Sequence, residues 1–331
     1  MEFSVVVPTL NGRRQLAACL DALEERLSDA EVVVVNGPST DGTSGMIHER
    51  SDVDVLVEIA DRNLNVARNA GLDAASGDVV ALLDESHLVE TTWLATVEEA
   101  IASGADVVTG PSHRPVRGGV TTEARERRTI AGREVTYFDG GNVALTREAI
   151  EELDGFDEYL ETGGARDLAH RLAGQGRTVD WRPGMGVRDS IETDGGDDPG
   201  GDPRIVRHGH GRTIVGGEIQ QRWAWKYRSL AYRLAKNYGP RPTVFRRLAG
   251  HTTTDGATSI RGVLKGEVTP TSWLGGGRTV TTSTLYGLKD GLRARVSDRT
   301  SRRNPNGISS RSDRAVERYD WHRRRRPRRP E

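Results

Sequence analysis

One stretch of the chain, residues 65–86 (NVARNAGLDAASGDVVALLDES), combines a guanidinium with two adjacent carboxylates. Arg68 lies on its predicted helix, and Asp84 and Glu85 follow its predicted strand, Asp78–Leu83. Carboxylate oxygens are the ligands that Mg²⁺ and Mn²⁺ prefer, and an arginine presents a rigid fork of donors to phosphate oxygens. The pattern therefore indicates a site for an anion and a divalent cation. The alternatives are a solvated acidic loop for the carboxylates and a surface salt bridge for Arg68.

The strand before the carboxylates is apolar without alternation, which is typical of a central parallel strand covered on both faces. Further apolar runs lie at Phe3–Val7, Glu31–Val35 and Val53–Ile59, and helical patterns separate them. This order predicts an α/β fold with a mostly parallel central sheet flanked by helices. Ligands of such sheets bind outside the carboxyl ends of the strands, which is where Asp84 and Glu85 are expected.

The second predicted strand runs into a turn rich in Gly, Ser, Thr and Asp, NGPSTDGT at residues 36–43. Such a turn before a helix offers backbone N–H groups and hydroxyls to an anion. The alternative is a tight turn without a ligand. Because similar turns follow successive strands, we favour a shared binding edge.

Charge is distributed very unevenly along the 331 residues. Residues 1–200 hold 38 acidic and 18 basic side chains, whereas residues 201–331 hold 10 acidic and 29 basic ones. The basic third favours a polyanionic partner, either nucleic acid or anionic lipid. The single Cys19 suits a reducing compartment. The sequence contains no run of about 18 apolar residues, so we expect no membrane-spanning helix. We expect a soluble or peripheral protein.

Five blocks together resemble a family 2 glycosyltransferase with the GT-A fold, of the kind found in haloarchaea. They are VVVPTLNG, EVVVVNGPSTDGTSG, NVARNAGLDAASGDVVALLDES, DGGNVALTREAIEELDGFDEYL and RDLAHRLAGQGRTVDWRPG. The resemblance covers roughly residues 1–190. It implies a nucleotide-diphosphate-sugar donor, a divalent cation (Mg²⁺ or Mn²⁺) on its pyrophosphate, and inverting transfer to a glycan or polyprenyl-lipid-linked acceptor in cell-surface glycan assembly.

The resemblance also assigns roles to individual residues. It implies that Pro8, Thr9 and Asn11 lie beside the base and ribose, and that Asn36 stands where the family usually has an Asp. Arg68 and Asp84 match the family's donor-binding helix and the first acid of its metal motif. The predicted metal ligands are Asp84 and Glu85.

The chain departs from the family at three positions. Ser86 replaces the last acid of the metal motif, and Gly164-Ala165 stand where the family carries Glu-Asp, whose Asp deprotonates the acceptor. We predict Asp167 as the general base, with Glu161 and Asp139 as lesser candidates. The family's metal-facing His is also missing. The alternative function is therefore a non-catalytic GT-A-like nucleotide-binding or scaffold protein.

A basic, Gly-hinged loop, RHGHGR, stands where relatives hold a lid over the donor phosphates. We expect Arg207 and Arg212 to bind the donor and neutralise the leaving diphosphate. His208 and His210 alone are a weak metal-ligand set.

The whole chain is predicted to divide into three parts. They are a GT-A domain over residues 1–215, a basic helical extension over 216–297 and a disordered Arg-rich tail over 298–331. In the extension, Glu218–Tyr238 is a predicted helix with an aromatic stripe and basic flanks. The stripe either attaches to an anionic membrane face or packs on the sheet domain. A second helix is predicted at Thr281–Val296. We expect a cytoplasmic protein, peripheral at the inner face of the cell membrane, without specific nucleic-acid binding. The stripe residues are Ile219, Trp223, Tyr227, Leu230 and Leu234.

Overall fold

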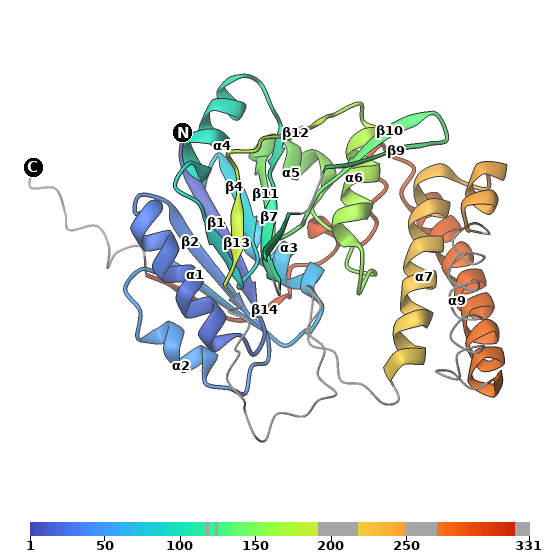
Figure 1. Cartoon of the computed structure of the whole chain (residues 1–331), viewed down its shortest axis with the longest axis horizontal. Coiled ribbons are helices and arrows are strands. Elements are labelled where there is room, and N and C mark those ends of the chain that lie inside the picture. Colours follow the sequence, from blue (N-terminus) through green and yellow to red (C-terminus); the bar gives the residue numbers. More distant parts are fainter. Residues whose placement is uncertain (117–118, 123–124, 191–217, 249, 251–269, 322–331) are drawn as a thin grey trace, which may run out of the picture. The chain divides into compact units, whose positions relative to one another are not determined.

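The computed structural model describes residues 1–116, 119–122, 125–190, 218–248, 250 and 270–321 (Figure 1). The strands are β1 (Phe3–Thr9), β2 (Glu31–Asn36), β3 (Val55–Ile59), β4 (Val79–Leu83), β5 (His87–Val89), β6 (Val107–Thr109), β7 (Ser112–Val116), β8 (Gly119–Thr122), β9 (Glu126–Ile130), β10 (Arg133–Tyr137), β11 (Asn142–Thr146), β12 (Val179–Trp181), β13 (Val187–Asp189) and β14 (Ala315–Asp320). The helices are α1 (Arg13–Arg26), α2 (Thr43–His48), α3 (Leu64–Ala74), α4 (Trp93–Ala102), α5 (Arg147–Leu153), α6 (Gly164–Gly174), α7 (Glu218–Tyr238), α9 (Pro270–Ser297) and the short 3-10 helix η1 (Ile308–Ser310).

The central sheet has eight strands in the order β12-β6-β11-β4-β1-β2-β3-β14. β1 pairs in parallel with both β2 and β4, and β2 pairs in parallel with β3, whereas β11 runs antiparallel between β4 and β6. The predicted α/β fold with a mostly parallel sheet is confirmed. The unbroken apolar runs formed these strands because helices cover both faces, so no position needed a polar side chain.

Alternate residues of β1 show how the two faces are covered. Val5 and Val7 belong to the core that also contains Leu16 and Leu20 of α1. On the other face, a Cβ added to Gly71 of α3 would lie 2.2 Å from Val6 Cγ1. Helix α3 therefore lies very close to the sheet. This close packing fixes the position of α3, and hence of Arg68, relative to β1.

The chain forms two compact units. One consists of residues 1–129, 133–193 and 304–331, and the other of residues 130–132 and 194–303. In the second unit, α7 and α9 pack in parallel: Arg228 pairs with Asp290 at 2.9 Å, and Arg295 Nη1 donates to the Lys236 carbonyl at 3.0 Å. Gly287 and Gly291 permit this contact, since Cβ atoms added there would lie 2.2 and 2.4 Å from backbone oxygens of α7.

The predicted aromatic stripe of α7 is in part a packing surface. Tyr227 and Leu234 are each 1% exposed. These two side chains are therefore not available to a membrane surface, and α9 is a neighbouring helix. Packing of the stripe on the sheet domain stays a prediction. Among the described residues, no helix combines the length and apolar character that crossing a bilayer requires.

The predicted disordered tail over residues 298–331 is wrong for residues 304–321. β14 pairs antiparallel with β3 as the edge strand, and Trp321 N–H donates to the Asp54 carbonyl at 2.7 Å. Tyr319 and Trp321 pack against the core and stack on each other, with centroids 5.9 Å apart. An edge strand with one solvated face alternates polar and apolar residues, so its composition resembles a polar tail. The Arg323–Arg329 run lies outside the described residues.

Candidate functional site

The carboxyl ends of β1, β2 and β4 meet at one edge of the sheet. Thr9 lies opposite Asn36 in the ladder, and Leu83, the residue before Asp84, lies opposite Asn142. Because β11 runs antiparallel, its first residue and the preceding Asp139-Gly140-Gly141 turn reach the same edge. The structure therefore brings together seven of the predicted site residues, which are Pro8, Thr9, Asn11, Asn36, Arg68, Asp84 and Glu85.

The turns after β1 and β2 are joined by a short chain of hydrogen bonds. Asn11 N–H donates to Ser39 Oγ at 2.9 Å, and that hydroxyl donates to Asn36 Oδ1 at 2.7 Å. Asn11 Oδ1 accepts from Thr40 N–H at 2.7 Å, with Asn11 in the left-handed region at φ 55°, a conformation that Asn tolerates. The Asn36 amide nitrogen has no hydrogen-bond partner among the described residues, so it can donate to a ligand carbonyl.

Asp84 presents one free carboxylate oxygen at the strand edge. Its Oδ1 accepts from Ser86 N–H at 3.0 Å and from Ser86 Oγ at 2.8 Å. Its Oδ2 has no hydrogen-bond partner among the described residues, and the side chain is half-buried. Ser86, which replaces an acid of the family motif, thus orients Asp84 instead of adding a second charge.

Glu85 faces away from this position. Its Oε2 accepts from the Thr9 hydroxyl and from Leu10 N–H, and its carboxyl packs on Gly12, where an added Cβ would lie 2.1 Å from Oε2. Burial, together with repulsion by Asp84, raises the pKa of Glu85 to about 7, although the Thr9 hydrogen bond opposes the rise. This geometry argues against the predicted role of Glu85 as a metal ligand and gives it the role of tying β4 to β1.

A divalent cation can be held here only with help from a bound ligand. The described residues contain no cluster of three or more His, Cys, Asp or Glu side chains suited to a metal ion. However, Mg²⁺ and Mn²⁺ commonly use one or two carboxylates and complete their coordination with substrate phosphates. Asp84 with its free Oδ2 fits this mode, so the site suits a cation that arrives with, or is completed by, a diphosphate.

Arg68 is a buried cation that donates no hydrogen bond to any of the described residues. Asn63 caps α3 by accepting from Asn65 N–H at 2.8 Å, which fixes the helix start and places Arg68 in its second turn. Arg68 is 5% exposed, its Cζ lies 5.0 Å from the Phe156 ring centroid, and its buried Nε has no partner. Burial lowers the pKa of its guanidinium, and the charges of Asp139 and Asp84 oppose this effect. Such an unpaired guanidinium beside a strand-end carboxylate is suited to bind an anion.

Gly140 makes room for the Arg68 side chain. A Cβ added to Gly140 would lie 2.8 Å from Arg68 Nη2 and 3.0 Å from Ala165 Cβ. Ala165 therefore lies beside the same glycine as the guanidinium. Since the family resemblance places an Asp at position 165, its replacement by Ala leaves this side of Arg68 without that carboxylate.

Asp167, predicted as the general base, has a structural role. It is fully buried in the first turn of α6, and its Oδ2 accepts from Arg171 Nε at 2.9 Å. Arg171 in turn donates to the carbonyls of Leu153 at 2.6 Å and Gly155 at 2.7 Å. A general base must reach the proton that it removes, and a carboxylate enclosed in this ion pair cannot. The geometry thus argues against the prediction.

The other candidates have different outcomes. Asp139 lies at the site edge, but its Oδ1 accepts from Gly141 N–H at 2.9 Å and its Oδ2 from Ser112 Oγ at 3.3 Å. Glu161 is exposed before α6. Arg207 and Arg212 lie outside the described residues. Sequence reasoning gave no role to Phe156, and the GFDE segment around it carried no chemical signal, because an apolar side chain supports Arg68 only after folding.

Comparisons with known proteins found similar proteins both by sequence and by fold. Residues 4–154 match the Glycosyl transferase family 2 profile. Glycosyltransferase AglE of Haloferax volcanii is 27% identical over 177 residues, which cover 49% of this chain and 58% of AglE. The 2-phospho-L-lactate guanylyltransferase of Halomicrobium mukohataei is 31% identical over 198 residues, covering 56% of this chain and 93% of that enzyme.

Among solved structures, the mannosyltransferase PcManGT of Pyrobaculum calidifontis, in complex with GDP-Man and Mn²⁺, is similar in fold. Its TM-score is 0.51 at 19% identity, and the match covers 90% of this chain and 88% of that one. This chain spans less than two thirds of the length of AglE. The profile match, the haloarchaeal relative and the shared fold lead to one conclusion: the chain carries a family 2 glycosyltransferase domain with the GT-A fold.

Proposed function

We propose that the chain transfers a sugar from a nucleotide-diphosphate-sugar to a glycan or polyprenyl-lipid-linked acceptor, with inversion at the anomeric carbon. The observation that carries this proposal is the buried Arg68 guanidinium, which has no hydrogen bond from the described residues and lies at the same strand edge as the free Oδ2 of Asp84. A diphosphate would satisfy both groups, directly at Arg68 and through a cation at Asp84. The GDP-Man and Mn²⁺ bound in PcManGT support this ligand class.

Each residue has a specific task in this proposal. Arg68 binds diphosphate oxygens and stabilises the charge that grows on the leaving group. Asn36 donates its amide to a carbonyl of the base, and the joined turns around Asn11 and Ser39 keep it in place. Asp84 would hold Mg²⁺ or Mn²⁺, which would neutralise the diphosphate. Arg207 and Arg212 remain proposed donor ligands.

The second candidate is a nucleotide-binding protein that does not transfer sugar. It is favoured by the absence of a carboxylate at Gly164-Ala165 and by the enclosure of Asp167 in its ion pair with Arg171. A third outcome, nucleotidyl transfer from a nucleoside triphosphate, is suggested by the similarity to the guanylyltransferase.

A ligand panel tests the proposal. We expect one of UDP-, GDP- or dTDP-sugars to raise the melting temperature in the presence of Mn²⁺, because a ligand that binds only the native state stabilises it. Asp84→Ala should remove the dependence on Mn²⁺ while leaving weaker, metal-independent binding through Arg68. Release of nucleoside diphosphate in the presence of acceptor separates transfer from binding alone.

The controls decide between the candidates. A shift with GTP but with no nucleotide-sugar would replace the proposal by nucleotidyl transfer. Binding without any turnover would favour the second candidate. Folded protein that shows no shift with any nucleotide would overturn the donor site itself. High salt belongs in each of these nucleotide-binding assays, because an acidic protein surface is self-repulsive at low ionic strength.

We further propose that one face of α9 attaches the protein to the anionic inner surface of the cell membrane. At 100° per residue, five exposed side chains fall within one stripe of about 100°. Leu285 and Tyr286 are 61% and 59% exposed. An apolar face carrying cations suits an interface with anionic lipid. The stripe consists of Leu285, Tyr286, Lys289, Arg293 and Val296.

Co-sedimentation with vesicles tests the attachment. At low salt we expect binding to phosphatidylglycerol vesicles and not to phosphatidylcholine vesicles, and the double variant Lys289→Glu/Arg293→Glu should lose several-fold in affinity. The exposed control Arg127→Glu/Arg128→Glu on β9 changes the net charge equally and should bind as the wild type does. Equal loss in both double variants would reduce the effect to net charge and contradict a specific face.

A further inference from the structure

The C-terminal residues 304–314, here called the latch segment, are fastened to the loop 154–158 that supports Arg68. Ile308 N–H donates to the Asp154 carbonyl at 2.9 Å, and Ser309 N–H donates to Asp154 Oδ1 at 2.8 Å. Asn304 Nδ2 also donates to the Asp154 carbonyl at 2.8 Å. The loop contains two consecutive left-handed residues, Asp154 at φ 56° and Gly155 at φ 66°. Asp tolerates this conformation, and the three contacts fix the loop to the latch segment.

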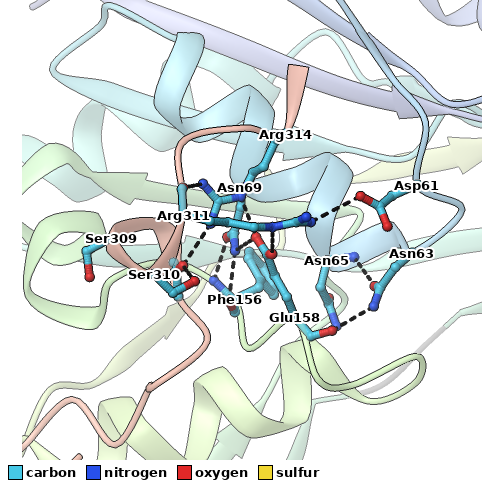
Figure 2. Close-up of polar contacts among 12 residues, drawn as sticks. Asp61, Asn63, Asn65, Asn69, Phe156, Glu158, Ser309, Ser310, Arg311 and Arg314 are labelled. Atoms are coloured by element: carbon cyan, nitrogen blue, oxygen red, sulfur yellow. Dashed lines mark hydrogen bonds and ion pairs between the residues drawn. The ribbon is translucent and has the colours of Figure 1, made fainter. Parts of the chain in front are cut away.

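Glu158 is the centre of the attachment (Figure 2). Arg314 Nε donates to Glu158 Oε1, and Arg311 Nε donates to Oε2 at 2.8 Å. The side chains of Arg314 and Glu158 are 4% and 8% exposed, so solvent screens this pair little. Arg311 Nη2 reaches Asp61 after β3 at 3.1 Å. Two arginines from the C-terminal part of the chain thus converge on one buried carboxylate.

Glu158 also contacts helix α3 through Asn69. Its Oε1 accepts from Asn69 Nδ2 at 2.8 Å. The Asn69 side chain also forms a closed pair with the Phe156 backbone, accepting from its N–H at 2.8 Å and donating to its carbonyl at 2.9 Å. Arg68 is the neighbour of Asn69 in α3, and its guanidinium lies over the Phe156 ring. Glu158 therefore holds Asn69, and Asn69 in turn holds the backbone of Phe156, whose ring lies under Arg68.

We propose that the latch segment is a positioning element of the donor site: Arg311 and Arg314 act through Glu158 to set the place of Arg68, and hence the affinity for a nucleoside diphosphate. The proposed effect on nucleoside-diphosphate affinity rests on the function proposed above, whereas the proposed effect on the position of Arg68 does not. The far end of the latch segment is held independently, because β14 pairs with β3 directly after it. The segment thus ties the edge of the sheet to the support of Arg68.

A double-mutant cycle tests the route from Glu158 to Arg68. Glu158→Gln keeps the size and one acceptor oxygen but removes the charge that attracts both arginines. We expect it to weaken binding of GDP, UDP or inorganic pyrophosphate with Mn²⁺ about 10-fold. In the Arg68→Met background the same change should have little further effect, because coupled residues are not additive. Equal losses in both backgrounds would overturn the route through Arg68.

Asp52→Asn is the matched control. Asp52 is a buried carboxylate that accepts from Arg50 at 2.7 and 2.6 Å, and it precedes the amino end of β3, whereas the candidate site lies at the carboxyl ends of the parallel strands. It should lower the melting temperature without changing the dissociation constant. If Glu158→Gln fails to fold, Arg311→Ala serves instead, because that side chain is 34% exposed; it should weaken binding in the same direction.

Hydrogen exchange separates the latch from the proposed function. In ligand-free protein, Glu158→Gln should speed amide exchange in residues 154–158 and in α3, whereas Asp52→Asn should not. Unchanged exchange at both places would overturn the latch even if nucleotides bind. If the wild type binds none of the three probes but exchange rises as expected, the donor-site function falls and the latch stands as a support of Arg68.

Discussion

Replacing Arg68 with Met should make the protein more stable and unable to hold a nucleoside diphosphate. The guanidinium is buried, its Nε has no partner, and the described residues give it no hydrogen bond. A buried unsatisfied charge costs more than an apolar side chain of similar length, so we expect a gain of roughly 1–2 kcal/mol in the free energy of unfolding. Loss of charge-assisted hydrogen bonds to phosphate should weaken binding about 100-fold. Thermal unfolding and calorimetric titration measure the two effects.

Arg147→Met provides the comparison for Arg68→Met. The Arg147 guanidinium donates to the carbonyls of Leu72, Ala75 and Gly77, around the opposite end of α3. Its replacement should lower the melting temperature and leave nucleotide affinity unchanged. A lower melting temperature for Arg68→Met as well, with unchanged affinity, would mean that Arg68 is a structural cation and would remove the basis of the proposed donor site.

Asp167→Ala should unfold the protein at a much lower temperature, and this loss should account for any loss of activity. Removal of one partner from a buried ion pair costs about 3–5 kcal/mol, because the other charge stays buried. Arg171 would also hold its carbonyl contacts at Leu153 and Gly155 less firmly. For a unit of this size, we expect a fall of roughly 10 °C in the melting temperature.

The double variant Asp167→Ala/Arg171→Met shows whether the pair itself is the cause. Removing both charges should recover part of the lost stability, since no unpaired charge remains. If Asp167→Ala keeps the melting temperature of the wild type and loses only turnover, Asp167 would be the general base after all, and the ion pair would have to open during the reaction.

The sequence predicts much of this architecture because its signals are local. Unbroken runs of Val and Leu predict β1, β2, β3 and β4 with ends within two residues of those observed, and the pattern at Glu218–Tyr238 predicts α7 with its observed bounds. A buried strand needs apolar side chains on both faces, and this requirement is visible in the strand itself. Asp84 at the edge follows directly, because the carboxyl end of a parallel strand has a fixed place in the sheet.

The sequence alone could not predict side-chain directions at the site. Glu85 turns away from the predicted metal position because Thr9, Leu10 and Gly12, more than 70 residues earlier, offer hydrogen bonds and space. Asp167 was predicted as the base because it is the acid retained two residues after Ala165, and its spacing of four from Arg171 is equally compatible with an ordinary pair on a helix surface. Only the folded structure shows that Asp167 and Arg171 are both buried.

Residues 1–190 therefore specify the fold class and the family, and they predict where on the sheet a ligand binds. Tertiary structure alone decided that Arg68 is left without a hydrogen bond, that Asp84 keeps a free oxygen, and that residues 304–321 return to support the site. The physical reason is the length scale of each interaction. Periodicity and strand position are properties of neighbouring residues, whereas burial and pairing depend on partners far apart in the sequence, such as Arg311 and Asp61, which are 250 residues apart.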